Sequence, residues 1–281
     1  MSIALGLLAA VAFGTCDFFA GLASRRMHPA AVSATAQLVA LVTALVSVLL
    51  FPGDGPTTHA LAWGAVGGAA SGCGTLALYH GMAVGRMSVV ATLSGLMTAV
   101  IPVLVGVAGG DTLTMASAIG IVLAIPATGL VSWHPSTAEH GGRAGPAWGF
   151  LSGFAFAILF IALDRAGTQS GAWPVVSSQV GSVLVTLPIA VRALARGTAR
   201  VGRQGIYLAI AAGVLIGIAT LSFLAATHTG QLAIVIVLTA LYPGVTAILA
   251  RVLLAEHWTP SQRVGLLAAF AAILLISAGS A

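Results

Sequence analysis

Residues 83–97 read AVGRMSVVATLSGLM, and residues 228–242 read HTGQLAIVIVLTALY. The two stretches align without a gap at an offset of 145 residues, from position 83 to position 228. The same offset pairs similar residues outside them: Gly68 with Gly213, Gly72 with Gly217, Asp111 with Glu256, Thr114 with Thr259, and Gly120 with Gly265. Similarity at a fixed spacing indicates a duplicated structural unit. The chain is therefore predicted to contain two copies of one unit.

The composition places both copies in a membrane. Of the 281 residues, 59% are hydrophobic and 6% are charged, whereas soluble domains carry about 25% charged residues. A bilayer-spanning helix needs about 20 apolar residues, and the chain offers ten such segments with short breaks between them. They cover residues 2–22, 31–51, 60–84, 87–108, 115–133, 147–164, 174–195, 206–227, 231–254 and 261–279. We expect an all-α polytopic membrane protein with ten transmembrane helices.

The odd number of helices in each copy determines how the copies are related. Repeat one covers residues 1–134 and repeat two covers residues 146–281, together forming a single transmembrane domain over residues 1–281. After five crossings the second copy enters the membrane from the opposite face, so the two copies form an inverted repeat. Inverted repeats are typical of transporters that expose a midplane site alternately to each side. A duplicated structural membrane protein is the alternative.

The arginines predict the orientation in the membrane. Ten of the eleven basic residues lie at connections that follow odd-numbered segments, and only Arg165 lies at the opposite end. Because cytoplasmic loops carry the excess of Lys and Arg, we expect a plasma (inner) membrane protein with both termini outside. The arginines are too scattered for a nucleic-acid-binding patch. The first segment lacks a positively charged start, so we expect a retained helix and no signal peptide.

The second half resembles a known family. Residues 227–279 contain a short polar link, an apolar run to Pro243, the turn sequence AEHWT at 255–259 and a final helix with Gly265. This order is similar to the closing half of an EamA-type transporter of the drug/metabolite transporter superfamily. In the first half, residues 78–131 are similar as well, and the sequence AFG at 12–14 resembles the aromatic-glycine step of that family's first helix.

The resemblance implies export or exchange of small metabolites through a central cavity. That cavity would be formed by helices one, three, four, six, eight and nine. Two features depart from the family pattern: Asp111 stands where the family usually has Glu, and the first helix lacks the lysine often found near its end.

Ionisable residues inside apolar segments are candidates for coupling or gating, because a charge in hydrocarbon is costly. Asp17 and His80 lie near the ends of the first and third segments, and Asp164 and His228 lie near the ends of the sixth and eighth. One hypothesis is that an acid and a histidine at each end form alternating gates, with protons as the coupling ion. The alternative is that these residues simply reach interfacial water, with Asp164 paired to Arg165.

Other polar residues have a structural interpretation. Asp111 and Glu256 occupy matching positions before a threonine, and we expect each to cap the helix that follows. Gln37 and Gln179 are expected to hydrogen-bond between helices, with substrate contact as the alternative. Glycines spaced four residues apart are expected to permit close helix packing: Gly64, Gly68 and Gly72, Gly213 and Gly217, and Gly145, Gly149 and Gly153. Pro102 and Pro243 mark the fourth and ninth helices for bending.

A second group of residues could line the cavity. Its members are aromatic, sulfur-containing or hydroxylated side chains on the helices that the family uses: Tyr79, Ser94, Met97, Phe156, Phe160, Phe223, Thr239 and Tyr242. For each of them, core packing is the alternative. As a set they suggest a neutral or zwitterionic amphipathic solute, because no buried arginine cluster is present to hold phosphate.

Enzymatic function is disfavoured. The chain lacks GxSG, HExxH and GxxxxGK[ST] motifs, and Cys16 and Cys73 do not have the spacing of metal ligands. We expect no catalytic residue, no metal and no cofactor. The sequence predicts a secondary active transporter, most simply an exporter of small metabolites or drug-like solutes such as amino acids, by alternating access. A passive facilitator or exchanger and a lipid-linked flippase are the alternatives, and the chain could act as a monomer or a homodimer.

Overall fold

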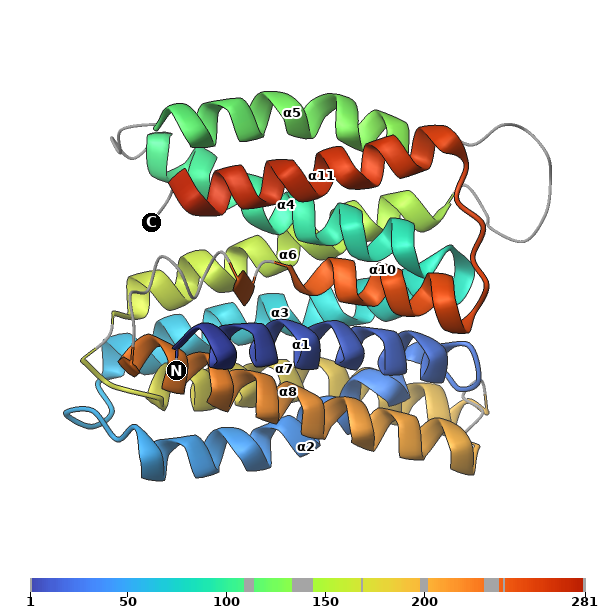
Figure 1. Cartoon of the computed structure of the whole chain (residues 1–281). Helices are drawn as coiled ribbons and strands as arrows, with labels where there is room; N and C mark the ends of the chain where they lie inside the picture. The colour runs from blue at the N-terminus through green and yellow to red at the C-terminus, as the bar shows by residue number, and fades with distance from the viewer. Residues whose placement is uncertain are drawn as a thin grey trace.

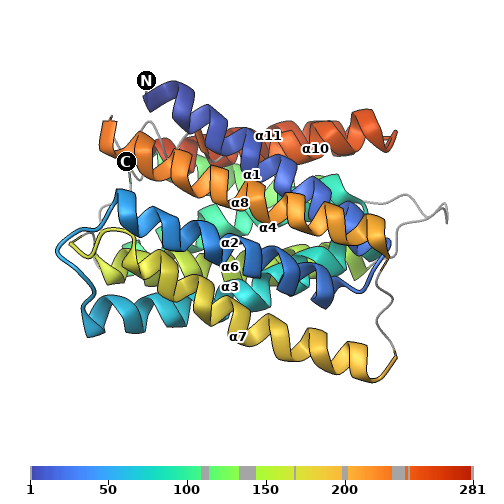
Figure 2. The ribbon, with the colours of Figure 1, turned by 90° about the horizontal axis from the view of Figure 1, so that it is seen from below.

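The computed structural model of the chain describes residues 2–108, 114–132, 144–167, 169–197, 202–229, 238–239 and 241–279. Within these residues the regular structure is α-helical, and the helices run side by side along a common direction (Figures 1 and 2). The helices are α1 (Ser2–Ser24), α2 (Pro29–Leu50), α3 (Thr58–Val84), α4 (Met87–Ala108), α5 (Met115–Ser132), α6 (Ala144–Ala166), α7 (Trp173–Ala195), α8 (Arg203–Thr229), α10 (Tyr242–Leu253) and α11 (Pro260–Gly279).

The lengths and apolarity of these helices identify a multi-pass membrane protein. Seven of the described helices, α1 to α4 and α6 to α8, have an apolar window long enough to cross a bilayer. Three shorter apolar stretches lie in α5, α10 and α11. The predicted helix over residues 231–254 is interrupted, because a turn at Leu241 precedes α10 and Pro243 stands in its first turn. A proline at that position has no amide hydrogen to donate, which suits a helix start.

Side-chain caps and prolines begin several helices. Pro29 opens α2, and the Nδ1 atom of His28 accepts the amide of Ala30 at 3.2 Å. Thr57 caps α3 by accepting the amide of Ala60 at 3.2 Å. These contacts satisfy amides that no turn of the helix itself can pair.

The spaced glycines let helices approach closely, as the sequence predicts. An added Cβ on Gly68 of α3 would lie 2.6 Å from the carbonyl carbon of Ser178 on α7. One on Gly213 of α8 would lie 2.6 Å from the Cβ of Val39 on α2. One on Gly149 of α6 would lie 3.0 Å from the carbonyl oxygen of Val90 on α4. Each of these helix pairs joins the first half of the chain to the second.

The helix contacts follow a paired pattern. α3 of the first half packs on α6 and α7 of the second half. In the same way, α8 of the second half packs on α1 and α2 of the first half. α4 packs on α6 as α10 packs on α1, while α5 and α11 pack on each other along one side of the bundle (Figure 1). These contacts thus have counterparts in which first-half and second-half helices are exchanged.

Connections gather at two ends of the bundle. At one end, two backbone hydrogen bonds join the α2–α3 and α6–α7 connections. The amide of Asp54 donates to the carbonyl of Gln169 at 2.8 Å, and the amide of Ala172 donates to the carbonyl of Phe51 at 2.9 Å. At the other end, which we call the arginine-rich end, Arg25 follows α1 and Arg86 follows α3. The grouping of odd and even connections predicted from the sequence agrees with these contacts.

Candidate functional site

Asp17 lies on the interior face of α1. At about 100° per residue, it is about 180° around the helix from Leu8, which is exposed, and within about 40° of Ala10 and Gly21, which are buried. Asp17 is nevertheless only partly buried. Its accessible surface therefore opens toward the space between helices, whereas the side of α1 carrying Leu8 faces outward.

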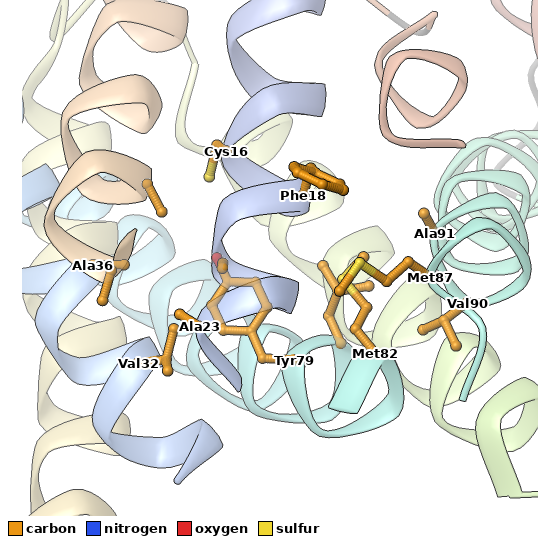
Figure 3. Close-up of a cluster of buried hydrophobic side chains, with 14 of the residues drawn as sticks. Cys16, Phe18, Ala23, Val32, Ala36, Tyr79, Met82, Met87, Val90 and Ala91 are labelled. Atoms are coloured by element: carbon orange, nitrogen blue, oxygen red, sulfur yellow. The ribbon is translucent and has the colours of Figure 1, made fainter. Parts of the chain in front are cut away.

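Tyrosines from two other helices lie near this carboxylate. They are Tyr79 of α3 and Tyr242 of α10. Tyr79 is almost fully buried and belongs to the same core cluster as Cys16 (Figure 3). The ring of Phe13, one turn before Asp17, meets the ring of Tyr242 edge-on at 6.3 Å between centroids. We call Phe13, Asp17, Tyr79 and Tyr242 the Asp17 site.

Glycines on α1 and α4 make room for this arrangement. The Tyr242 hydroxyl lies 3.7 Å from the position that a Cβ on Gly95 would take, so this side chain spans from α10 to α4. A Cβ on Gly14 would lie 2.5 Å from the Cβ of Val245, which holds α10 against α1. The site thus combines α1, α3, α4 and α10, and all four belong to the helices that the family resemblance implies.

Two methionines separate the Asp17 site from the arginine-rich end. Gly21 lies one turn beyond Asp17, and a Cβ there would be 2.8 Å from the sulfur of Met82 and 3.2 Å from that of Met87. Both methionines are fully buried and extend toward each other in Figure 3. The space around Asp17 is therefore closed toward this end by sulfur side chains packed on a glycine.

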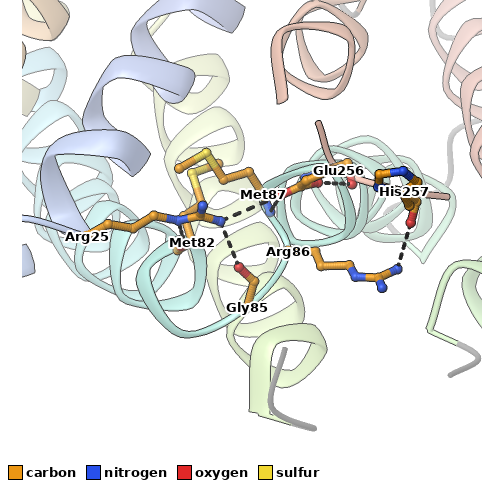
Figure 4. A network of polar contacts seen from close by, with 8 residues as sticks. Arg25, Met82, Gly85, Arg86, Met87, Glu256 and His257 are labelled. Carbon is orange, nitrogen blue, oxygen red and sulfur yellow. Dashed lines mark hydrogen bonds and ion pairs between the residues drawn. The ribbon is translucent and has the colours of Figure 1, made fainter. Parts of the chain in front are cut away.

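Glu256 closes the arginine-rich end with a polar network. Its carboxylate accepts the amides of Met87 and Ser88, at 2.9 and 3.3 Å, and the hydroxyl of Ser88 at 2.7 Å. It also pairs with Arg25 at 3.6 Å (Figure 4). The Glu256 side chain is only 9% exposed. One carboxylate from the second half therefore binds the residue that follows α1 and the start of α4 in the first half.

Arginines extend this network to neighbouring segments. Arg25 donates to the carbonyls of Met82 and Gly85, at 3.2 and 3.3 Å. Arg86 donates to the carbonyl of His257 at 3.2 Å (Figure 4). It also donates to Oε1 of Gln262 at 2.8 Å. We call Arg25, Arg86, Met87, Ser88, Glu256 and Gln262 the Glu256 network.

The expected capping role of Glu256 needs correction. Glu256 caps α4, which lies in the other half, and not the following helix α11. α11 is capped by Thr259 and Gln262, in which Oγ1 of Thr259 accepts the amide of Gln262 at 3.3 Å and Oε1 of Gln262 accepts the amide of Thr259 at 3.1 Å. This capping box satisfies the local amides, so Glu256 remains available to α4. Asp111, its counterpart in the repeat, lies outside the described residues.

The four gate candidates occupy separate places. His80 does not face Asp17 directly; its ring meets that of Trp148 on α6 edge-on at 4.7 Å. Asp164 is exposed near the end of α6, beside Arg165. The backbone of His228 belongs to α8, but its side chain lies outside the described part of the structure. At the arginine-rich end, the ion pair that the structure does show is formed by Arg25 and Glu256, which the sequence interpretation did not treat as a gate.

The remaining cavity candidates are mostly packed between helices. The Ser94 hydroxyl lies 3.1 Å from that of Ser152 on α6, and Met97 packs against the α4, α5 and α11 core. Phe156 lies 3.0 Å from the position of a Cβ on Gly74. Phe160 is 52% exposed on α6.

Two further candidates and the glutamines are placed as follows. Phe223 is partly buried on α8. Oγ1 of Thr239 is buried and has no hydrogen-bond partner within the described residues. The same holds for Oε1 of Gln37 on α2, so the interhelical bond expected for this atom is not observed there. Gln179 is partly buried on α7.

Comparison with known proteins supports the family resemblance. Residues 143–278 match the model of the EamA-like transporter family, which belongs to the drug/metabolite transporter superfamily. The matched segment begins just before α6 and ends within α11. No curated protein matches the chain. The family match and the apolar helices support a membrane transporter of this superfamily, and the family implies a small-molecule substrate and a lipid bilayer as partners.

Proposed function

We propose that this membrane transporter of the drug/metabolite superfamily is a secondary active exporter of small metabolites or drug-like solutes, such as amino acids. It works by alternating access and exchanges substrate for protons. The observation that carries this proposal is the Glu256 network, which ties the second half of the chain to the first half at one end of the bundle. Beyond it lies a partly exposed carboxylate, Asp17, on an interior helix face.

The closed end favours a gate over a permanent pore. A solute at Asp17 would have to pass the methionines packed on Gly21 and then the ion pair of Arg25 with Glu256. Arg25 remains 32% exposed, and an ion pair near water contributes only about 0–1 kcal/mol. Such a contact can be broken and re-formed in a transport cycle. The amides of α4 that Glu256 caps would then be satisfied by water.

The exchange symmetry of the helix contacts supports alternating access. The contacts of α3 with α6 and α7 and of α4 with α6 have counterparts with the halves exchanged, in α8 with α1 and α2 and in α10 with α1. In an inverted repeat, the conformation open to one side is related to the other by exchange of the two halves' conformations. A bundle closed at the arginine-rich end therefore has an accessible alternative in which the opposite end closes.

The environment of Asp17 supports proton exchange. Among the described residues, the one salt bridge joins Arg25 to Glu256, and none involves Asp17. An ionised carboxylate within the apolar bundle is costly without a partner. Binding of a proton or of substrate removes that cost, and this makes the two events mutually exclusive at one carboxylate.

Cross-linking of the gate tests the proposal. Arg25→Cys and Glu256→Cys are introduced after replacement of Cys16 and Cys73 by Ser, and the protein is reconstituted in proteoliposomes. A bifunctional methanethiosulfonate reagent should stop solute uptake and proton flux, and reduction should restore both. The two single-cysteine variants treated in the same way are the controls.

The alternatives predict different results. A passive facilitator would show solute flux without proton flux, both before cross-linking and after reduction of the cross-link. A flippase would move a fluorescent lipid in the absence of any solute. Undiminished solute transport by the cross-linked protein would show that the Glu256 network is not a gate.

A further inference from the structure

A hollow lies where α3 begins and α6 ends, at the end of the bundle opposite the arginine-rich end. It has a volume of about 530 Å³, and its polar lining comes from Thr57, His59, Arg165, Gln169 and Ser170. We call it the Arg165 hollow. We propose that it binds the headgroup of an anionic phospholipid through its phosphate, with Arg165 as the counter-ion. This inference is independent of the transport function proposed above.

The charges of the lining favour an anion. Arg165 is exposed, and the one ion pair of the described residues joins Arg25 to Glu256, so Arg165 has no carboxylate partner among them. The nearby acids Asp54 and Asp164 do not line the hollow. The planar guanidinium group offers several N–H donors in a geometry that matches phosphate oxygens. The Arg165 hollow thus presents one positive charge and no negative one.

Two hydroxyl groups add donors to the lining. Oγ1 of Thr57 accepts the amide of Ala60 at 3.2 Å and lies 3.4 Å from Oγ of Ser170. This second contact is long, because hydroxyl groups usually bond at about 2.5–3.0 Å. It can use only one of the two hydroxyl protons, so at least one remains to donate to a ligand. Ser170 is only 2% exposed, and a buried donor without an acceptor is costly.

Backbone contacts hold the walls of the hollow in place. Nε2 of His59 lies 2.9 Å from the carbonyl oxygen of Arg165, and since a carbonyl can only accept, Nε2 carries the hydrogen. The carbonyl of Gln169 accepts the amide of Asp54 at 2.8 Å. Residues 165 and 169 of the second half are therefore both tied to the first half. A ligand would meet a preformed lining, which lowers the entropic cost of binding.

The depth of the hollow favours a lipid as the source of the phosphate. The ring of His59 meets that of Trp63 edge-on at 6.4 Å between centroids, and tryptophans near helix ends belong to the membrane interface. Val66 lies within about 20° of His59 around α3 and about 10 Å further along it. Because Val66 is 51% exposed on a helix apolar enough to cross a bilayer, we expect this face to contact acyl chains. His59 then forms a wall of the hollow on its lipid side.

The same lining separates anionic from zwitterionic headgroups. A phosphatidylglycerol headgroup carries one negative charge, which Arg165 neutralises. A phosphatidylcholine headgroup adds a quaternary ammonium group, and the lining offers no carboxylate to balance it. We therefore expect the anionic headgroup to bind more tightly.

Four ligands test this assignment on the purified full chain in a neutral detergent. Dihexanoyl phosphatidylglycerol and dihexanoyl phosphatidylcholine differ in headgroup charge, dihexanoylglycerol has no phosphate, and glycerol phosphate has no acyl chains. Isothermal titration calorimetry measures each affinity. We expect phosphatidylglycerol to bind about tenfold or more tightly than each of the other three, because a charge-assisted contact is much stronger than a neutral one and the acyl chains add apolar contact.

Variants assign the binding to the hollow. Arg165→Gln should weaken phosphatidylglycerol binding about tenfold or more, and Arg165→Lys should recover part of the loss. Ser170→Ala should weaken it about three- to tenfold. Gln169→Glu adds a carboxylate to the lining at an exposed position and should weaken it as much as Arg165→Gln does. Arg192→Gln, which removes an exposed arginine of α7, makes the same change in net charge and should bind like the unaltered chain.

Several results would overturn the inference. Equal binding of phosphatidylcholine or dihexanoylglycerol would show that the anionic phosphate is not recognised. Glycerol phosphate binding as tightly as phosphatidylglycerol would identify a site for free phosphate esters and not for a lipid. An equal loss in Arg192→Gln would indicate general charge attraction. If Arg165→Gln lowers the melting temperature of the lipid-free protein, Gln169→Glu decides, and unchanged phosphatidylglycerol binding in that variant would place the lipid elsewhere.

Discussion

The Thr246 hydroxyl on α10 donates a hydrogen bond of 2.9 Å to the backbone carbonyl of Gly14 on α1. In the other half, the Thr98 hydroxyl on α4 donates to the carbonyl of Gly153 on α6 at 3.4 Å. Both glycines lie where a side chain would collide with the opposing helix. These two crossings, each linking one half to the other, hold α10 against α1 and α4 against α6.

Substitutions at the α1–α10 crossing should separate packing from hydrogen bonding. Gly14→Ala adds a Cβ 2.5 Å from that of Val245, and overpacking of this kind costs about 1–3 kcal/mol. Thr246→Val removes one hydrogen bond, a loss of about 1 kcal/mol. We therefore expect Gly14→Ala to lower the melting temperature in detergent more than Thr246→Val. The reverse order would show that the crossing is held mainly by the hydroxyl.

A glycine at the α3–α7 contact can be compared with Gly202, an uncrowded glycine that directly precedes α8. Gly68→Ala would place its Cβ 2.6 Å from the carbonyl carbon of Ser178, whereas a Cβ on Gly202 would meet nothing within 4 Å. We expect Gly68→Ala to destabilise the fold by about 1–3 kcal/mol and Gly202→Ala to change it by less than about 0.5 kcal/mol. Thermal unfolding in detergent measures both. Equal melting temperatures would mean that α3 and α7 can move apart without cost.

The helices were predictable because apolar length is a strong signal in a membrane protein. The expected and observed fourth helices share the bounds 87 and 108. Glycines four residues apart predicted the tight helix contacts, since a missing side chain has a direct steric effect. The break before Tyr242 was only partly foreseen, because Pro243 is compatible either with a bend or with a helix start.

The polar contacts were less predictable, because they depend on which segments meet in space. The cap on α11 was visible as a threonine followed three residues later by glutamine, at Thr259 and Gln262. Recognising it would have left Glu256 without a local role and suggested a distant partner. That Arg25 is this partner could not be read from the sequence, since residues 25 and 256 are 231 positions apart. His80 was grouped with Asp17 by depth in the membrane, but the two lie on different helices, and the His80 ring faces Trp148.

The α11 cap provides a test of this local assignment. Thr259→Ala removes the side chain that accepts the amide of Gln262, and loss of such a cap costs about 0.5–2 kcal/mol. The same change at Thr114, whose Oγ1 accepts the amide of Ser117 at 3.2 Å at the start of α5, should have a similar effect. Melting temperatures of the two variants should fall by similar amounts. A much larger fall for Thr259→Ala would indicate that its cap also supports the Glu256 network through Gln262.

Asp17→Asn should uncouple transport from protons. Asparagine keeps the size of the side chain and cannot change its charge, so it removes the carboxylate that binds either proton or substrate. In proteoliposomes with an internal pH-sensitive dye, we expect substrate-driven proton flux to be lost, while exchange of a neutral solute continues. Asp164→Asn should retain both activities. Proton flux that survives in Asp17→Asn would assign coupling to another group.

Glu256→Gln should shift the conformational equilibrium toward opening of the arginine-rich end. Glutamine retains one oxygen for the amide of Met87 but loses the charge that pairs with Arg25. It also loses the favourable interaction of a carboxylate with the N-terminal end of α4, worth about 0.3–1 kcal/mol. A free-energy change of about 1–2 kcal/mol for the two contacts together corresponds to a roughly five- to thirtyfold shift in a two-state equilibrium.

A cysteine introduced at Met82, which is fully buried behind the network, reports this shift. The measured quantity is its rate of maleimide labelling in a Cys16→Ser, Cys73→Ser background. The rate should rise several-fold in Glu256→Gln and fall again when substrate stabilises the closed end. Arg25→Gln should raise it as well, since it removes the other member of the same ion pair. An unchanged labelling rate in both variants would mean that the methionines on Gly21 close this end without help from the polar network.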